Sequence, residues 1–178
     1  MTLRADSHTE DAISIRAATV ADAKCLIDLK SRLERDAEFL ITSPVDPCTG
    51  VELVSAAIKN NVSSTLSNIL VAEAGEALIG VALSRSHIHP AYRGVVQLDI
   101  GVEASHRRSG LGKQLVNRTL DWAEFNGVHR IQLAVVDANR PAIDLYHRCG
   151  FEIEGTLRRA VRINGTLHDV HVMARLLI

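Results

Sequence analysis

The chain has 178 residues, enough for one domain with a sizeable hydrophobic core. Its formal net charge of −1 shows no bulk basic or acidic excess, which argues against nucleic acid or a membrane surface as a partner. No apolar run approaches the roughly 20 residues that cross a bilayer. The segment 1–10 is polar and lacks the apolar core of a signal peptide, so we expect a cytoplasmic protein.

The cysteines and histidines indicate neither a disulfide framework nor a metal site. Cys25, Cys48 and Cys149 are an odd number without metal-ligand spacing, so we expect reduced thiols. The pair His87 and His89 could place both rings on one face of a strand, but no third ligand accompanies them. The sequence therefore predicts no bound metal.

The N-terminal half is predicted to hold one strand, two helices and a hairpin. We expect residues 1–11 to be a disordered tail and residues 12–178 to form a single domain. Thr19 and Asp22 have the spacing of a capping box, which predicts a helix start there. In chain order the predicted elements are a strand at 12–17, a helix to about 35, a loop at 38–50 with Pro44 and Pro47, a helix at 51–60, strands at 69–74 and 78–84, and a loop at 87–94.

The C-terminal half alternates strands with helices and ends in a hairpin. Asn164 and Gly165 are the strongest short hairpin signal in the sequence. The predicted elements are strands at 95–102 and 129–136, helices at 110–125 and from Asn139 to Gly150, and strands at 151–163 and 166–176. This order predicts a mixed α/β fold with one sheet, partly antiparallel through hairpins and partly joined through helices.

A basic, glycine-containing loop follows the strand at 95–102 and leads into a helix. Its sequence is His106-Arg107-Arg108-Ser109-Gly110-Leu111-Gly112-Lys113. The first N–H groups of a helix lack partners, and glycines let an oxyanion approach the backbone closely. The arginines and the lysine add positive charge. The loop therefore has the features of a phosphate-binding site.

Other interpretations of this loop remain open from the loop alone. The spacing matches neither the Walker loop nor the dinucleotide-binding fingerprint. An ordinary strand–turn–helix connection with solvated arginines fits equally well. The spacing Arg107-x-x-Gly110-x-Gly112 resembles the acyl-CoA pyrophosphate loop of the GNAT N-acetyltransferase superfamily.

A second segment strengthens that resemblance. The family form N-x-x-A-I-x-L-Y-x-x-x-G-F is matched by Asn139, Ala142, Ile143, Leu145, Tyr146, Gly150 and Phe151. The segment from Phe151 to Met173 is similar to the branch that holds ribosomal-protein N-terminal and L-amino-acid N-acetyltransferases. The resemblance implies the GNAT fold, with a single central mixed sheet of about seven strands and helices on both faces.

The resemblance also implies acetyl-CoA as the acyl donor, bound in a V-shaped gap between the strands at 97–102 and 130–136. The backbone of Ile100 and Val102 would bond the pantetheine amides. The loop residues Arg107, Arg108, Ser109, Gly110, Leu111, Gly112 and Lys113 would hold the pyrophosphate. Asn139 would contact the cofactor near the thiol, cap its helix, or do both.

Tyr146 and Asp99 are the candidate catalytic residues. Attack of a neutral amine on a thioester expels a thiolate, and a tyrosine hydroxyl suits a donor to that sulfur. The family places the tyrosine that matches Tyr146 near the sulfur, and a backbone N–H near Val102 could stabilise the oxyanion. Relatives often carry an acid where this chain has Gln97, which cannot act as a base, so Asp99 is the candidate base.

Other groups remain possible as the base or belong to the acceptor site. His87, His89 and His168 could take a proton by their chemistry, whereas Glu103 lies close to the cofactor loop. The segment 32–50, the loop 87–92 and the last hairpin are expected to line the acceptor site.

The resemblance favours an N-acetyltransferase acting on a primary amine of a small molecule such as an amino acid, a polyamine or an amine antibiotic. A protein N-terminal or lysine acetyltransferase, or a non-catalytic acyl-CoA-binding module, are the alternatives. Family members often dimerise through their last strands, which implies a homodimer.

Overall fold

The computed structural model describes residues 12–36, 38–39, 47–62, 66–87 and 89–177. The tail expected at 1–11 lies outside the described residues. The elements are β1 (Ser14–Ala17), η1 (Val20–Asp22), α1 (Ala23–Asp36), α2 (Pro47–Val62), β2 (Asn68–Ala74), β3 (Ala77–Ser86), η2 (Pro90–Tyr92), β4 (Val95–Val102), η3 (Ala104–His106), α3 (Leu111–Phe125), β5 (Arg130–Val136), α4 (Arg140–Arg148), β6 (Glu152–Ile163) and β7 (Thr166–Leu176).

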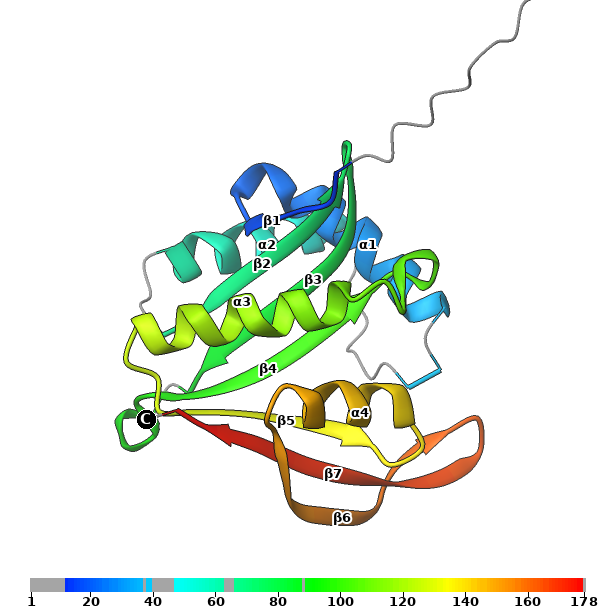
Figure 1. Ribbon diagram of the computed structural model, residues 1–178. Helices are drawn as coiled ribbons and strands as arrows, with labels where there is room; N and C mark the ends of the chain where they lie inside the picture. The colour runs from blue at the N-terminus through cyan, green and yellow to red at the C-terminus, as the bar shows by residue number, and fades with distance from the viewer. Residues whose placement is uncertain (1–11, 37, 40–46, 63–65, 88, 178) are drawn as a thin grey trace, which may run out of the picture.

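One mixed seven-stranded sheet runs through the molecule in the order β1-β2-β3-β4-β5-β7-β6 (Figure 1). All neighbouring strands are antiparallel except β4 and β5, which are parallel because α3 connects them. This confirms the predicted fold class, and the parallel pair lies in the middle of the sheet.

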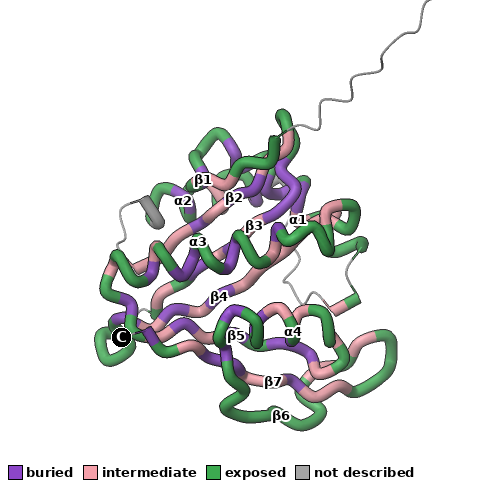
Figure 2. The backbone as a smooth tube through the Cα atoms, in the orientation of Figure 1, coloured by how far each residue is buried: buried purple, intermediate pink, exposed green. Residues whose placement is uncertain are grey.

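Helices cover both faces of the sheet and bury two separate apolar clusters. Helices α3 and α4 lie on the face seen at the front of Figure 1, and α1 and α2 lie behind β1–β4. The larger cluster, on the α3/α4 face, includes Val96, Leu98, Leu115, Tyr146 and Phe151. Figure 2 shows the buried inward stripe of α3 and, in contrast, β6 exposed along most of its length.

The first helical turn is anchored by the predicted capping box. The backbone N–H and the hydroxyl of Thr19 donate to Asp22 Oδ2 at 2.7 and 2.9 Å. The Arg16 guanidinium donates to both Asp22 carboxylate oxygens at 2.8 and 2.9 Å and pairs with Glu73 on β2. These bonds, Arg16 first, hold the pKa of the buried Asp22 carboxyl far below its usual range. The box therefore ties β1, α1 and β2 together.

The predicted loop at 38–50 is too long, because α2 already begins at Pro47. Two prolines within four residues argue for a loop when the sequence is read locally. Proline is nevertheless well tolerated in the first turn of a helix, where its missing N–H would have no partner.

Strands β4 and β5 pair over only three positions and then separate. The pairs are Val95 with Arg130, Val96 with Ile131 and Gln97 with Gln132. Beyond Gln97, β4 keeps its register with β3 to Val102, and β5 keeps its register with β7 to Val136. A gap therefore opens toward the end of β4 that leads into α3, on the right in Figure 1.

Candidate active site

The backbone of Ile100 and Val102 points into this gap. The N–H of Glu103 donates to the carbonyl of Ile79 on β3 at 2.9 Å, and Val102 lies opposite Gly80. Because backbone groups alternate in direction along a strand, the N–H and C=O groups of Val102 and Ile100 face away from β3 and toward β5. No strand pairs with them there among the described residues. The gap thus offers both main-chain groups of Ile100 and the N–H of Val102, whereas the carbonyl of Val102 accepts from Arg107.

The loop after β4 presents further amides at the mouth of the gap. Arg108 and Gly110 have positive φ values of 62° and 88°, which turn the chain sharply before α3. The first main-chain bond of α3 runs from the N–H of Gln114 to the carbonyl of Gly110 at 3.1 Å. The N–H groups of Gly112 and Lys113 precede this bond and have no acceptor within the described part of the chain. Unpaired N–H groups at a helix N-terminus are the kind of donors that bind anions.

A cavity of about 890 Å³ joins this loop to the gap. Side chains of α1, of the turn after it, of β4, of the loop and of α4 form its wall. The lining residues are Leu33, Asp36, Glu38, Phe39, Ile100, Gly101, Val102, Arg107, Arg108, Gly110, Gly112, Lys113, Asn139, Pro141, Ala142, Asp144, Leu145 and Arg148.

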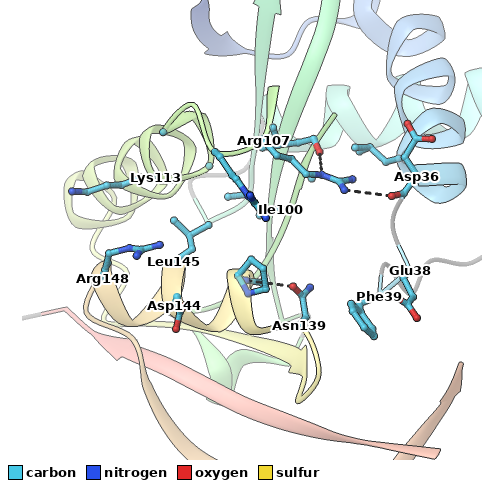
Figure 3. Close-up of a pocket in the computed structure, with 18 residues that line it drawn as sticks. Asp36, Glu38, Phe39, Ile100, Arg107, Lys113, Asn139, Asp144, Leu145 and Arg148 are labelled. Atoms are coloured by element: carbon cyan, nitrogen blue, oxygen red, sulfur yellow. Dashed lines mark hydrogen bonds between the residues drawn. The ribbon is translucent and has the colours of Figure 1, made fainter. Parts of the chain in front are cut away.

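The cavity has two chemically different ends. Lys113 on α3 and Arg148 on α4 lie on one side of it, and Glu38 and Phe39 lie on the other (Figure 3). The space between α3 and α4 is tight, because a Cβ on Gly112 would come within 3.1 Å of Leu145 Cδ2. Glycine at this position allows the two helices to approach each other beside the loop.

Arg107 makes contacts that the sequence does not indicate. Its Nε donates to the carbonyl of Val102 at 3.0 Å, and its Nη1 donates to the carbonyl of Asp36 at 3.3 Å (Figure 3). The side chain therefore joins the end of α1 to the end of β4. We expected it to flank a pyrophosphate; in the structure its guanidinium makes these two bonds, although it still lines the cavity. Arg108 lines the cavity with no hydrogen bond or ion pair to the described residues.

A second arginine binds α1 to the same loop. Arg32 donates to Glu103 Oε1 and to the carbonyl of Leu78, both at 2.7 Å. Glu103, which was expected to lie close to the cofactor loop, is thus engaged in an ion pair. A Cβ on Gly101 would come within 2.5 Å of Leu33 Cδ1, so the absence of a side chain there lets α1 pack directly on β4.

The remaining predicted loop residues act locally through their side chains. Asn139 caps α4, since its Oδ1 accepts from the N–H of Ala142 at 3.3 Å, and it also lines the cavity. The Ser109 hydroxyl donates to the carbonyl of His106 at 2.7 Å. The side chain of Leu111 is buried in the core, and its N–H donates to the Ser109 hydroxyl at 3.4 Å.

The side chain of Tyr146 extends from α4 into the core on the face of the sheet that α3 and α4 cover. It is 6% exposed, and its ring lies 5.8 Å from that of Phe151, centroid to centroid. Its hydroxyl makes no hydrogen bond to any described residue. Burial, together with the nearby charges of Asp99 and then Cys149, raises the pKa of the phenol well above its usual value. The group therefore stays a neutral hydrogen-bond donor at physiological pH.

Asp99 lies on the opposite face of the sheet from Tyr146. Val96 and Leu98 belong to the cluster under α3 and α4, so the alternating residue Asp99 faces α1 and α2. It forms an ion pair with Arg85 of β3. The two candidate catalytic residues thus approach the gap from its two sides, and Asp99 is close enough to perturb the phenol electrostatically.

The candidate histidines are spread over two regions. His87 and His89 pack against Tyr92 in the connection between β3 and β4. That connection lies at the closed end of the gap, where Gly94 accepts from the N–H groups of His129 and Arg130, and its described residues do not line the cavity. His168 on β7 lies 3.6 Å from Asp137, Nδ1 to Oδ1, and packs edge-on against Phe39.

Sequence reasoning did not single out Asp144 and Arg148 of α4, whereas part of the segment 32–50, which was expected near the site, does line the cavity. Asp144 and Arg148 line the cavity one helical turn apart, a spacing that the α4 pattern contains. The sequence does not indicate that Arg85 pairs with Asp99, because that pairing depends on the register between β3 and β4. Among the described residues no cluster of three or more His, Cys, Asp or Glu side chains could hold a metal ion.

Comparison with known proteins identifies the class of protein that this site belongs to. The model of the Acetyltransferase (GNAT) family matches residues 40–151. An N-alpha-acetyltransferase, RimI, of Mycobacterium tuberculosis is 30% identical over 164 residues, 92% of each chain. A phosphinothricin N-acetyltransferase of Streptomyces viridochromogenes is 26% identical over 159 residues, 89% of this chain and 84% of that protein.

Solved structures agree in fold. A GNAT-family acetyltransferase of Streptococcus pneumoniae superimposes with a TM-score of 0.86 at 26% identity, covering 93% of this chain and all of that one (100%). The chain therefore belongs to the GNAT family of acetyltransferases. It is an N-acetyltransferase in class, and within its described residues no helix is long and apolar enough to span a membrane.

Proposed function

We propose that the protein transfers an acetyl group from acetyl-CoA to the primary amine of a small molecule, such as an amino acid, a polyamine or an amine antibiotic, within a ternary complex. The observation that carries this proposal is the gap between β4 and β5, which exposes main-chain groups of Ile100 and Val102 beside an anion-binding loop. Tyr146 and Asp99, the two candidate catalytic residues, lie on opposite faces of the sheet beside the same gap.

The residues present fit acetyl-CoA as the acyl donor. The free N–H groups of Gly112 and Lys113, with the charges of Arg108 and Lys113, suit a pyrophosphate. The main chain of Ile100 and Val102 suits the amides of an extended pantetheine arm, which would take the place of a strand in the gap. The cofactor supplies an activated acetyl group as a thioester.

Tyr146 is the proposed hydrogen-bond donor to the departing thiolate. As the amine nitrogen bonds to the acyl carbon and the carbon–sulfur bond breaks, negative charge moves to sulfur. A neutral phenol without a hydrogen-bond partner among the described residues is free to donate to that charge. The backbone N–H of Val102, which faces the gap, is the proposed donor to the carbonyl oxygen.

Asp99 is the proposed acceptor of the amine proton. Its carboxylate lies across the gap from Tyr146, on the face that an acceptor reaches from the α1/α2 side. The proton lost by nitrogen passes to Asp99, directly or through water, while the thiolate gains a proton delivered through Tyr146. The products are then the amide and the free thiol, so charges and atoms balance.

The first test is a product assay with pooled acceptors. Purified protein is incubated with acetyl-CoA and pools of free amino acids, polyamines, aminoglycosides and N-terminal peptides, and acetylated products are read by mass spectrometry. A product in a small-molecule pool supports the proposal. A product in the peptide pool alone would instead indicate a protein N-terminal acetyltransferase.

Tyr146→Phe is the matched variant for this assay. The substitution keeps the ring that packs against Phe151 and removes only the hydroxyl. We expect turnover to fall about 100- to 1,000-fold, the effect of losing one donor to developing charge. Thermal stabilisation by acetyl-CoA should be retained. Loss of both, or of neither, would contradict the role given to Tyr146, and stabilisation without any product would indicate a non-catalytic acyl-CoA-binding module.

We also propose that the protein forms a homodimer through its last two strands. Four large apolar side chains on β6 and β7, namely Ile153, Leu157, Leu167 and Leu176, are between 43% and 67% exposed. Exposed large apolar side chains along one hairpin are a common feature of interfaces. Light scattering on the purified protein measures the mass directly, and a monomer at micromolar concentration would contradict the proposal.

A further inference from the structure

Arg85 and Asp99 form an ion pair whose position is better explained by substrate binding than by stability. Arg85 lies opposite Gln97, and Asp99 lies opposite Leu83, so the two charged side chains are diagonal neighbours on the same face of β3 and β4. These strands are already joined by a continuous ladder from Gly80–Val102 to Ser86–Val96. The ion pair is therefore not needed to hold β3 and β4 together.

The exposure of this pair distinguishes it from the other ion pairs near the site. The side chains of Arg85 and Asp99 are 60% and 45% exposed. Arg32 and Glu103, which join α1 to the cofactor loop, are 33% and 20% exposed. An exposed pair of charges contributes little to folding stability and is easily rearranged. Arg85 makes no hydrogen bond to any other described residue, so most of its N–H donors are free.

The pair also lies beside the gap between β4 and β5, outside the residues that line the 890 Å³ cavity. The last β4–β5 pair is Gln97 with Gln132, so Asp99 is the first residue on its face beyond the point where the strands separate. Its charge acts on the Tyr146 phenol, which lies on the other face. An amine that reaches the gap from the α1/α2 side thus meets Asp99 first, with the Arg85 guanidinium beside it.

Resting on the proposed function, we infer that Arg85 and Asp99 together bind the zwitterionic end of an α-amino acid, with its carboxylate on Arg85 and its amino group on Asp99. An α-amino acid carries opposite charges on neighbouring atoms, and this matches an adjacent guanidinium and carboxylate. A guanidinium also binds a carboxylate in a bidentate, directional way. The acceptor class is therefore narrowed from primary amines in general to free amino acids and their analogues.

The test compares matched acceptors that differ only at the carboxyl group. The amino acid turned over fastest in the pooled assay is tested beside its carboxamide and its decarboxylated amine. For leucine these are L-leucinamide and isoamylamine, and for phenylalanine they are L-phenylalaninamide and phenethylamine. We expect the wild-type protein to prefer the amino acid over both analogues, which lack the carboxylate, by about ten- to a hundredfold in kcat/KM, the effect of a charge-assisted contact.

Arg85→Gln should remove this preference selectively. Its KM for the amino acid should rise by about the same factor, while kcat/KM for the decarboxylated amine changes less than about twofold. Arg85→Lys should restore part of the preference. Arg93→Gln, an exposed arginine in the connection between β3 and β4, is the control and should behave like the wild type. Melting temperatures of all variants confirm that they are folded.

Three results would overturn the inference. The wild-type protein could acetylate amines and amino acids equally well, or only amines such as polyamines. Arg85→Gln could lower the turnover of all acceptors by one common factor, which would mean that Arg85 acts through Asp99 and not on the acceptor. In each case acetylation itself persists, so the proposed function survives. If no acceptor of any kind is acetylated, the proposed function fails instead.

Discussion

Asp22→Asn tests whether the capping box is held by charge or only by shape. Asparagine has the shape of aspartate, but it offers one acceptor oxygen and no charge to Arg16 and Thr19. Hydrogen bonds to charged groups contribute about 1.5–3 kcal/mol. Because the Arg16 side chain is 38% exposed, solvent screening reduces this figure, and we expect a loss of about 1–2 kcal/mol. In a domain of this size that corresponds to about 2–8 °C in melting temperature.

The stability lost in Asp22→Asn should become smaller as the pH falls. The pKa of Asp22 is lowered in the folded protein, chiefly by Arg16, and an unfolded aspartate titrates near about 4. Its stabilising contribution is therefore complete above about pH 5 and is lost as the pH falls through the folded-state pKa. The difference between the wild type and Asp22→Asn should be constant from pH 7 to about 5 and should shrink below about 4.

Urea denaturation followed by circular dichroism across this pH range gives the free energies of unfolding. Asp28→Asn, which replaces an exposed acid on the adjoining helix α1, is the control and should change stability by less than about 0.5 kcal/mol at every pH. If the difference in unfolding free energy between the wild type and Asp22→Asn stays unchanged down to pH 3, the charge of Asp22 is not its source and the reasoning is refuted.

Three further predictions concern packing and exposure. Gly101→Val should cost about 1–3 kcal/mol in urea denaturation, because its Cβ would overlap with Leu33, and a neutral result would mean that α1 is loosely held. The exposed Cys25 should be alkylated rapidly by iodoacetamide, whereas Cys149 should react slowly because burial protects its thiol and raises its pKa. Peptide mapping by mass spectrometry measures the two rates separately, and equal rates would contradict the structure. Phe125→Ser should leave the melting temperature within about 2 °C, since the ring is 90% exposed, and a large drop would indicate an unseen contact.

Most of the elements were predictable because each carries a local signal. The alternation before Gly101, the glycines of the cofactor loop and the Asn164-Gly165 turn are short patterns whose physical meaning does not depend on the rest of the chain. Both residues of that turn have positive φ values, 48° and 82°, as the hairpin type requires. The start of α2 at Pro47 was missed because a proline can begin a helix as well as interrupt a chain.

The side-chain partners in the site were not predictable in the same way. Arg107 bonds the end of α1, which lies 71 positions away in the sequence, so its conformation depends on how α1 packs. The partner of Asp99 depends on the register between β3 and β4. The sequence does not determine that register, because the shape of the connection between the two strands is not known from it. The placement of the connection 87–92 could have been reasoned out, since a link between β3 and β4 must lie at the opposite end of β4 from the cofactor loop.

The strand order also has a consequence for biosynthesis. Strand β7 is made after β6, yet it lies between β5 and β6 in the sheet. Until Thr166–Leu176 has left the ribosome, β5 has no neighbour on that side and β6 has none at all. A chain without this segment would therefore leave one edge of β5 and both edges of β6 unpaired, the kind of surface that recruits other chains. Synthesis of the last strand therefore gives β5 and β6 their shared neighbour and leaves β6 as one edge of the finished sheet.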